Sequence, residues 1–207
     1  MVDLPKPTLI VLSHYPDLFA EFKHNVDEME PALPKFLVRD GDLIRLHDVF
    51  GENWDVAQGF EPFIYARNMN LAWERTSGDV LIAGDDVRFG EPFAAKLQEV
   101  AYSDPRIGFA VPELGGQSAF VCAYVKRELI TQVGPLDEQF SGYGFEDNDY
   151  CRRFEALGWR TQPTTEVKVR HDSTASSYHR RMAESGDYLQ FAACRNEARF
   201  KKKWGLA

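Results

Sequence analysis

Short apolar runs alternate with longer amphipathic stretches along this chain. A run of apolar residues between polar neighbours is typical of a buried strand, whereas apolar residues three and four apart mark one face of a helix. The pattern predicts strands at 9–12, 35–38, 80–83, 107–111, 119–124 and 166–170. It predicts helices at 17–30, 63–76, from about 92, at 146–157 and through most of 176–203. The alternation indicates an α/β fold, with helices on the faces of a central sheet.

Two adjacent carboxylates, Asp85 and Asp86, follow the predicted strand 80–83. Ligands of α/β sheets bind at the carboxyl ends of the strands. Neighbouring carboxylates repel each other, and a hard divalent cation such as Mg2+ or Mn2+ relieves the repulsion through oxygen ligands. The alternative is an acidic turn in solvent, or a cap for the next helix.

A second acidic pair, Glu146 and Asp147, opens a predicted helix after a glycine-rich loop. Acidic residues in a first turn cap free N–H groups and suit the helix dipole, which is the simpler interpretation. Helical spacing directs Tyr150, Phe154 and Leu157 toward the core, and Asp147 to the same side as Phe154. An inward carboxylate at this position can serve as a general base.

His171 directly follows the predicted strand 166–170. Imidazole is a common metal ligand, although most histidines hold a polar surface position instead. The chain has no HExxH, GxxxxGKS/T, GxGxxG or GxSxG motif, so zinc-hydrolase, kinase, dinucleotide-dehydrogenase and α/β-hydrolase interpretations have no support. Its three cysteines have no metal-site spacing and are interpreted as thiols in a reducing compartment.

Composition limits the class of protein further. The chain has 207 residues, enough for one domain, with 44% hydrophobic and 27% charged residues. Its net charge of −8 argues against a nonspecific nucleic-acid binder. The basic runs at 180–181 and 201–203 are interpreted as solvated helix faces, with a local basic face as the alternative. No apolar run reaches bilayer length and no signal peptide opens the chain, so we expect a cytoplasmic location.

One long segment carries a family resemblance. Residues 134–160 read GPLDEQFSGYGFEDNDYCRRFEALGWR, which is very similar to the "G.fDE.F..yg.ED.D...R....G" segment of the inverting glycosyltransferases of family 2. Residues 64–89 resemble the stretch in which that family runs from a helix through a strand to an acidic DxD-type motif. Residues 169–171 match a late strand that ends in a metal-binding histidine, and 200–205 resemble a frequent C-terminal "F..KWG". The match covers about residues 36–205.

The resemblance implies a GT-A fold in a single domain over 1–207, with a mostly parallel sheet. A nucleotide-sugar-binding half, about 1–90, would join an acceptor-binding half, about 91–207. Mn2+ or Mg2+ is the implied cofactor. A nucleoside-diphosphate sugar is the implied donor. The implied acceptor is a saccharide, a protein, a lipid-linked molecule or a small molecule. The acidic net charge disfavours a nucleic-acid acceptor.

The family's residue roles carry over by position. Asp147 resembles the catalytic base and Glu146 its companion. Asp86 and His171 look like the metal ligands, with Asp85 near the sugar or ribose. Asp40, Arg67 and Asn68 correspond to residues that contact the nucleotide or brace its pocket. Tyr143 and Phe145 correspond to acceptor-binding residues, although they are interpreted equally well as core aromatics.

Three departures from the family pattern bear on function. Gly84 stands where the family often has Asp or Asn, and the first strand leads into Ser13-His14-Tyr15-Pro16 rather than a Thr/Asn-rich loop. The chain also lacks the QxxRW motif of processive synthases. We therefore expect transfer of one sugar in a single displacement that inverts the anomeric carbon. The alternatives are an inactive binding module of the same fold and a nucleotide-sugar pyrophosphorylase.

Overall fold

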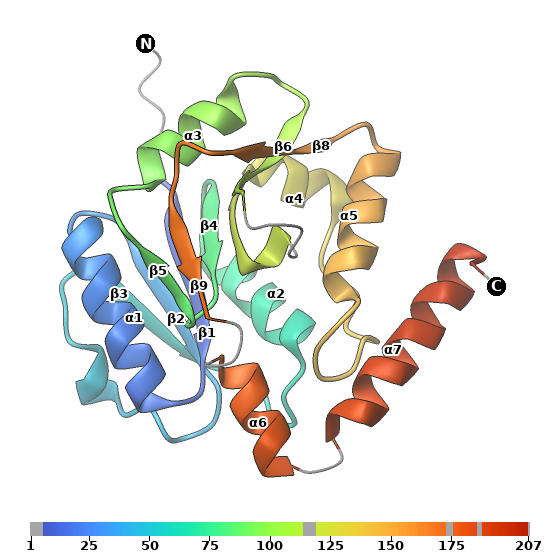
Figure 1. Ribbon diagram of the computed structural model, residues 1–207, viewed down its shortest axis with the longest axis horizontal. Coiled ribbons are helices and arrows are strands. Elements are labelled where there is room, and N and C mark those ends of the chain that lie inside the picture. The colour runs from blue at the N-terminus through green and yellow to red at the C-terminus, as the bar shows by residue number, and fades with distance from the viewer. Residues whose placement is uncertain (1–5, 114–118, 173–175, 186–187, 207) are drawn as a thin grey trace.

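A seven-stranded sheet forms the centre of the computed structural model (Figure 1), which describes residues 6–113, 119–172, 176–185 and 188–206. The strand order is β3-β2-β1-β4-β7-β6-β8. The strands are β1 (Thr8–Ser13), β2 (Lys35–Arg39), β3 (Trp54–Gln58), β4 (Val80–Ala83), β6 (Ile107–Pro112), β7 (Cys122–Val125) and β8 (Arg160–Thr164). Only β7 pairs antiparallel with its neighbours, so the sheet is mostly parallel as predicted. β5 (Val87–Phe89) and β9 (Val169–His171) form a separate antiparallel pair.

Helices cover both faces of the sheet. Buried residues of α1 (Pro16–Met29) and α3 (Ala94–Tyr102) belong to one core, and those of α2 (Tyr65–Arg75), α4 (Arg127–Val133) and α5 (Glu146–Ala156) to the other. Short 3-10 turns occur at η1 (Leu46–Val49) and η2 (Ala119–Val121). The chain ends in α6 (Ser177–Ser185) and α7 (Tyr188–Trp204), and α7 flanks α5 (Figure 1). Within the described ranges, no helix combines the length and the apolar character needed to cross a bilayer.

The two cores follow from the alternation of side chains along the strands. Leu9 and Val11 of β1 enter one core and Ile10 enters the other, because successive side chains of a strand point to opposite faces. The same holds for Leu81 and Ile82 of β4. A sheet covered on both faces needs strands that are apolar on both sides, which explains why the sequences of the central strands are continuous apolar runs.

Several predicted elements have different bounds in the structure. The strand expected at 119–124 begins at Cys122, after a 3-10 turn. The strand expected at 166–170 is Val169–His171, so His171 ends that strand instead of following it. The single helix expected over most of 176–203 is two helices, α6 and α7. Leu157, expected in the core, is 51% exposed because α5 ends at Ala156.

Four elements have no counterpart in the sequence prediction: β3, β5, β8 and α4. β3 and β8 are the two edges of the large sheet and carry the sequences WDVAQ and RTQPT. An edge strand can be short and polar, because one side of it faces solvent or a covering loop. Such strands lack the apolar pattern that marks the central ones.

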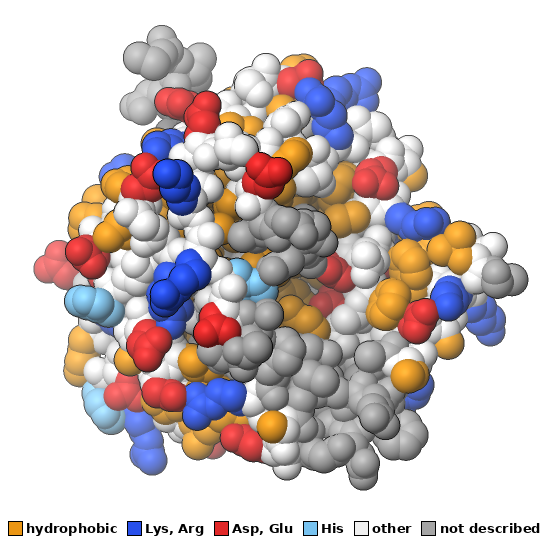
Figure 2. Space-filling view, viewed as in Figure 1, with side chains coloured by type: hydrophobic (Ala, Val, Ile, Leu, Met, Phe, Trp, Pro, Cys, Tyr) orange, Lys and Arg blue, Asp and Glu red, His pale blue; other side chains and the backbone are white. Residues whose placement is uncertain are grey.

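The parallel arrangement brings distant polar residues to one edge. β1, β2 and β4 run side by side in the same direction, so Ser13, Asp40 and Asp85 come together where these strands end. Acidic and basic side chains are interspersed over the face of the molecule that Figure 2 shows.

We predict that Phe109→Ala lowers the free energy of unfolding by about 3–5 kcal/mol, the usual range for a buried Phe truncated to Ala. Phe109 is fully buried on β6, and its ring lies 5.1 Å from that of Phe154 and 5.5 Å from that of Phe120, centroid to centroid. The control is Leu157→Ala, which should change stability by no more than about 0.5 kcal/mol. Urea denaturation of both variants measures this, and equal losses would contradict the core described above.

Candidate active site

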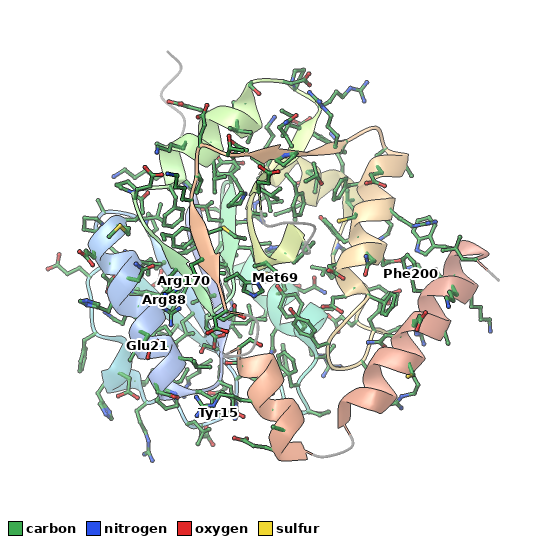
Figure 3. All side chains as sticks on the ribbon, in the orientation of Figure 1. Tyr15, Glu21, Met69, Arg88, Arg170 and Phe200 are labelled. Atoms are coloured by element: carbon green, nitrogen blue, oxygen red, sulfur yellow. The ribbon has the colours of Figure 1, made fainter. Side chains whose placement is uncertain are left out.

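A cavity of about 210 Å³ opens where β1, β2 and β4 end. Its wall combines polar groups from these strand ends with aromatic side chains from α2 and the loop before α5. Met69 of α2, labelled near the centre of Figure 3, belongs to the wall. The remaining described lining side chains include Ser13, Asp40, Tyr65, Asp85, Asp86, Tyr143, His171, Ser177 and Arg181.

Asp85 lies at the bottom of this cavity and is 3% exposed. Its Oδ2 accepts hydrogen bonds from the Ser13 hydroxyl at 2.6 Å and from the Ser177 hydroxyl, and Ser177 N approaches Oδ1 at 3.4 Å. Burial raises the pKa of Asp85 to about 6, and the charge of Asp86 adds to the rise. Asp85 is therefore a structural acceptor that ties β1 and α6 to the acidic turn.

Asp86 contacts His171 in the wall of the cavity. The distance from Asp86 Oδ2 to His171 Nε2 is 3.0 Å, and β5 and β9 hold the pair in register through Val87 and His171. Burial raises the pKa of Asp86, while the nearby imidazole opposes that rise. The sequence placed both residues at strand ends; the structure brings them into contact.

Gly84 allows Asp86 to take this position. A Cβ built at Gly84 would lie 2.4 Å from Asp86 Oδ1, closer than atoms of neighbouring side chains approach. The departure from the family's Asp or Asn at this position thus has a steric reason in this chain: a side chain here would displace the carboxylate that faces His171.

Asp40 follows β2 and is 2% exposed. It forms an ion pair with Arg181 of α6, and the Glu61 side chain is close enough to hydrogen-bond to the Asp40 carboxyl group. No well-formed hydrogen bond to Asp40 Oδ1 is found among the described residues. Burial raises the pKa of Asp40 to about 7, with Arg181 opposing the rise and Glu61 contributing to it. A buried acceptor atom without a partner costs free energy, which a bound donor group would recover.

Helix α6 closes one side of the cavity through residues that sequence patterns did not mark. Besides the contacts of Ser177 and Arg181, Arg180 pairs with Asp17 at 2.6 Å, and the Tyr15 hydroxyl donates to Glu184 at 2.6 Å. The basic pair at 180–181, interpreted as a solvated face, therefore binds α6 to the start of α1 through Asp17 and to the end of β2 through Asp40. No local sequence signal reveals these contacts, because the two acidic partners are more than 140 residues away.

The second acidic pair stands at the start of α5. Glu146 is 2% exposed, and burial together with the charge of Asp147 raises its pKa to about 8. Asp147 is half-buried, and its Oδ1 accepts a hydrogen bond from the backbone N–H of Asn148 at 2.8 Å. Neither residue lines the cavity. Tyr65 and Tyr143 do line it, and negative charge on Glu146 or Asp147 adds to the rise that burial causes in the pKa of both tyrosines.

The loop before α5 is fixed from two sides. Gly142, Gly144 and Phe145 all have positive φ, of 70°, 103° and 71°. Buried Asn196 of α7 donates to the carbonyls of Ser141 and Gly144, both at 2.9 Å. These contacts hold the turn that presents Glu146 and Asp147. No sequence motif predicts the role of Asn196, because its partners lie more than 50 residues away.

Tyr143 and Phe145, the two aromatic residues of this loop, have different surroundings. The Tyr143 ring lies 5.1 Å from that of Tyr65, centroid to centroid, in the cavity wall. Phe145 points away from the cavity, and its ring lies 5.5 Å from that of Phe200, which projects from α7 toward α5 (Figure 3). Only Tyr143 is therefore placed to contact a molecule in the cavity.

Arg67 and Asn68 lie outside the described lining of the cavity. Arg67 pairs with Glu138 at 3.3 Å on the surface. Asn68 is fully buried, and its Oδ1 accepts a hydrogen bond from the backbone N–H of Phe60 at 2.8 Å. Asn68 thus braces the 59–60 turn beside the end of β3.

The donor atoms in the cavity fit a divalent cation only in part. No group of three or more His, Cys, Asp or Glu side chains in the described ranges is arranged to hold a metal ion. Asp86 and His171 supply one oxygen and one nitrogen that face each other. A cation bound there would need further ligands from a substrate or water, as Mg2+ and Mn2+ commonly do.

Comparisons with known proteins identify the type of fold. Neither the protein-family models nor the curated proteins contain a match to this chain. Among solved structures, it is similar to a mannosyltransferase from Pyrobaculum calidifontis in complex with GDP-Man and Mn2+, with a TM-score of 0.65 and 17% identity over 89% of this chain and 61% of that one. The chain has the GT-A glycosyltransferase fold.

Two further structures share this architecture. GalNAc-T7 with UDP, GalNAc and Mn2+ has a TM-score of 0.65 and 12% identity, over 83% of this chain and 44% of that one. The catalytic domain of Drosophila β1,4-galactosyltransferase 7 with xylobiose has a TM-score of 0.56 and 15% identity, over 87% and 80%. This chain thus spans less than two thirds of the first two proteins.

We predict that Glu146→Gln changes how stability depends on pH. The pKa of Glu146 rises from 4.5 to about 8 on folding, so between these values the folded protein binds more protons and its stability falls as pH rises. The variant lacks this titration, and its stability relative to the wild type should increase from pH 4.5 to about 8 and then level off.

Urea denaturation across this pH range tests the prediction. Glu155→Gln, an exposed position on the same helix, is the matched control and should leave the pH dependence in place. A constant difference between Glu146→Gln and the wild type at all pH values would contradict a buried, proton-binding Glu146.

Proposed function

We propose that this protein is a metal-dependent glycosyltransferase that moves one sugar from a nucleoside-diphosphate sugar to an acceptor hydroxyl, with inversion, as the resemblance to family 2 implies. The observation that carries the proposal is the Asp86–His171 pair at the carboxyl edge of the sheet. It occupies that edge in a fold shared with proteins solved with nucleotide or nucleotide sugar and Mn2+. In this proposal residues 1–90 form the nucleotide-sugar-binding half and 91–207 the acceptor-binding half, which also contributes His171 and Arg181 to the donor site.

The donor's nucleoside is proposed to lie against Asp40. The carboxylate is buried, and its Oδ1 has no well-formed hydrogen bond to the described residues. An N–H of a base or a ribose hydroxyl can satisfy that atom. Arg181, now paired with Asp40, is placed to meet the phosphates once a nucleoside takes over that carboxylate.

Asp86 and His171 would hold the cation, with Asp85 buried behind them. A divalent cation bound there would act as a Lewis acid that stabilises the charge on the leaving nucleoside diphosphate. Asp86 needs no large change to bind it, because its carboxylate already faces the imidazole at 3.0 Å.

Asp147 is proposed as the general base for the acceptor hydroxyl. A sugar hydroxyl is a weak nucleophile at neutral pH, so a carboxylate must accept its proton as the new bond forms. Glu146 is less suited to this role, because burial and the charge of Asp147 raise its pKa to about 8 and favour its protonated form at neutral pH. One base without a protein nucleophile gives a single displacement, and hence inversion. Tyr143 would form the wall between donor and acceptor.

We predict that Asp147→Asn lowers sugar transfer by about 100- to 10,000-fold, the usual contribution of a general base. Binding of the nucleotide sugar with Mn2+ should remain, because Asp147 does not line the cavity. Product formation with a panel of UDP-, GDP- and dTDP-sugars, and calorimetry with the same donors, measure the two effects.

The matched control is Glu155→Gln on the same helix, which should retain transfer. Loss of donor binding in Asp147→Asn would contradict the assigned role of a base. A wild type that binds donors with Mn2+ but transfers nothing to any acceptor, with biological activity unchanged in Asp147→Asn, would favour an inactive binding module.

We predict that Gly84→Ala weakens Mn2+ binding by about 10- to 100-fold, the usual effect of disturbing the support of a metal ligand. The added Cβ would collide with Asp86 Oδ1. Gly90→Ala is the control, because nothing lies within 4 Å of a Cβ there. Electron paramagnetic resonance of free Mn2+ with nucleoside diphosphate present measures the affinity, and equal affinities in both variants would contradict a role of Gly84 in positioning Asp86 for the metal.

A further inference from the structure

Tyr65 is the first residue of α2 and forms part of the cavity wall. The residue is 8% exposed, and its ring makes T-shaped contacts with the rings of Tyr143 and Phe120, at 5.1 Å and 6.4 Å between centroids. No hydrogen bond to its hydroxyl group is found among the described residues. A nearly buried phenol usually has such a partner. The hydroxyl group of Tyr65 is therefore a polar group of the wall that a bound molecule can satisfy.

This hydroxyl group lies near both acidic pairs of the site. Burial raises the pKa of Tyr65 well above its usual value of 10, and negative charge on Glu146, Asp147 and Asp86 adds to the rise. The phenol is thus within electrostatic reach of both the proposed base and a proposed metal ligand. It also stays protonated at neutral pH, so it can donate one hydrogen bond and accept others.

The backbone of Tyr65 ties the cavity to the loop that carries the proposed base. Its N–H group donates a hydrogen bond to the carbonyl of Gly142 at 2.7 Å. Gly142 precedes Tyr143, which lines the cavity, and the same loop leads into Asp147. A molecule against Tyr65 would therefore lie between the proposed metal ligands and Asp147, where the carbon that the acceptor attacks must be held.

The surroundings of Tyr65 suit a neutral sugar better than a phosphate. Met69, one turn further along α2, and Phe120 add apolar surface to the same wall. Asp147 contributes negative charge, which repels a phosphate but favours the positive charge that develops on the anomeric carbon as its bond to the leaving group breaks. The guanidinium of Arg181, by contrast, enters the cavity from α6 and suits the phosphates.

We propose that Tyr65 binds the sugar that is transferred, through a hydrogen bond between its hydroxyl group and a hydroxyl group of the donor sugar. This role rests on the proposed transferase function and adds a residue that distinguishes a nucleotide sugar from the bare nucleotide. The phenol ring packs in the wall whether or not a donor is bound, so the hydroxyl oxygen is the atom that recognises the sugar. Tyr65 therefore contributes to the affinity for the nucleoside-diphosphate sugar and not to that for the nucleoside diphosphate.

Calorimetry in the presence of Mn2+ tests this role with UDP-glucose, GDP-mannose and dTDP-glucose, each beside UDP, GDP or dTDP alone. Tyr65→Phe removes one oxygen atom and keeps the ring. It should bind the nucleoside diphosphate like the wild type and the matching nucleotide sugar about three- to tenfold more weakly, because one hydrogen bond is lost. Among monodeoxy derivatives of that nucleotide sugar, the one that lacks the contacted hydroxyl group should bind both proteins equally.

The matched control is Tyr102→Phe, which also removes one phenol oxygen. Tyr102 is 43% exposed, its hydroxyl group donates to Asp79 at 2.7 Å, and it lies outside the described cavity wall, so both affinities should stay at their wild-type values. Equal losses of nucleotide and nucleotide-sugar affinity in Tyr65→Phe, as a merely structural role would give, or no loss of either, would overturn the role of Tyr65 alone. Failure of the wild type to bind any of these nucleotides would instead overturn the transferase function and this role with it.

Discussion

Asp85 and Asp86 are adjacent carboxylates that both lie almost entirely out of solvent at the end of β4. Burial penalises each negative charge, and the neighbouring charge adds to the penalty. Hydrogen bonds from the hydroxyl groups of Ser13 and Ser177 offset this penalty for Asp85, and the imidazole of His171 offsets it for Asp86. These partners come from β1, α6 and β9, so the acidic turn joins the first strand to the C-terminal part of the chain.

The same constraint explains the backbone around the cavity. A glycine at position 84 leaves room for the Asp86 carboxylate, whose Oδ1 would lie 2.4 Å from a Cβ there. The short β5–β9 pair exists beside this turn and holds His171 opposite Asp86. On the other side, α7 fixes the loop before α5 through Asn196. The loop that lines the cavity through Tyr143 and leads into Glu146 and Asp147 is therefore held in place by α7.

The sequence identified the chemistry-bearing groups that follow central strands. Asp85 and Asp86 line the cavity, because parallel strands end at a common edge. His171 reaches the cavity through the pairing of β9 with β5. Asp40, assigned through the resemblance, lines it as well. It did not find Ser13, Ser177, Arg181 or Asn196, whose partners lie far away in the chain and leave no local spacing to detect. Residues assigned only through the resemblance, such as Arg67, Asn68 and Phe145, proved to lie outside the described cavity wall.

By itself the sequence determined the α/β class and the central strands, because a sheet buried on both faces requires continuous apolar runs. The edge strands β3 and β8 lack such runs, and only pairing with β2 and β6 makes them strands. The C-terminal segment, predicted as one helix, is two helices, α6 and α7. The register that sets Asp86 opposite His171 also exists only in three dimensions, because hydrogen-bonded pairing between β5 and β9 fixes it across more than 80 residues of chain.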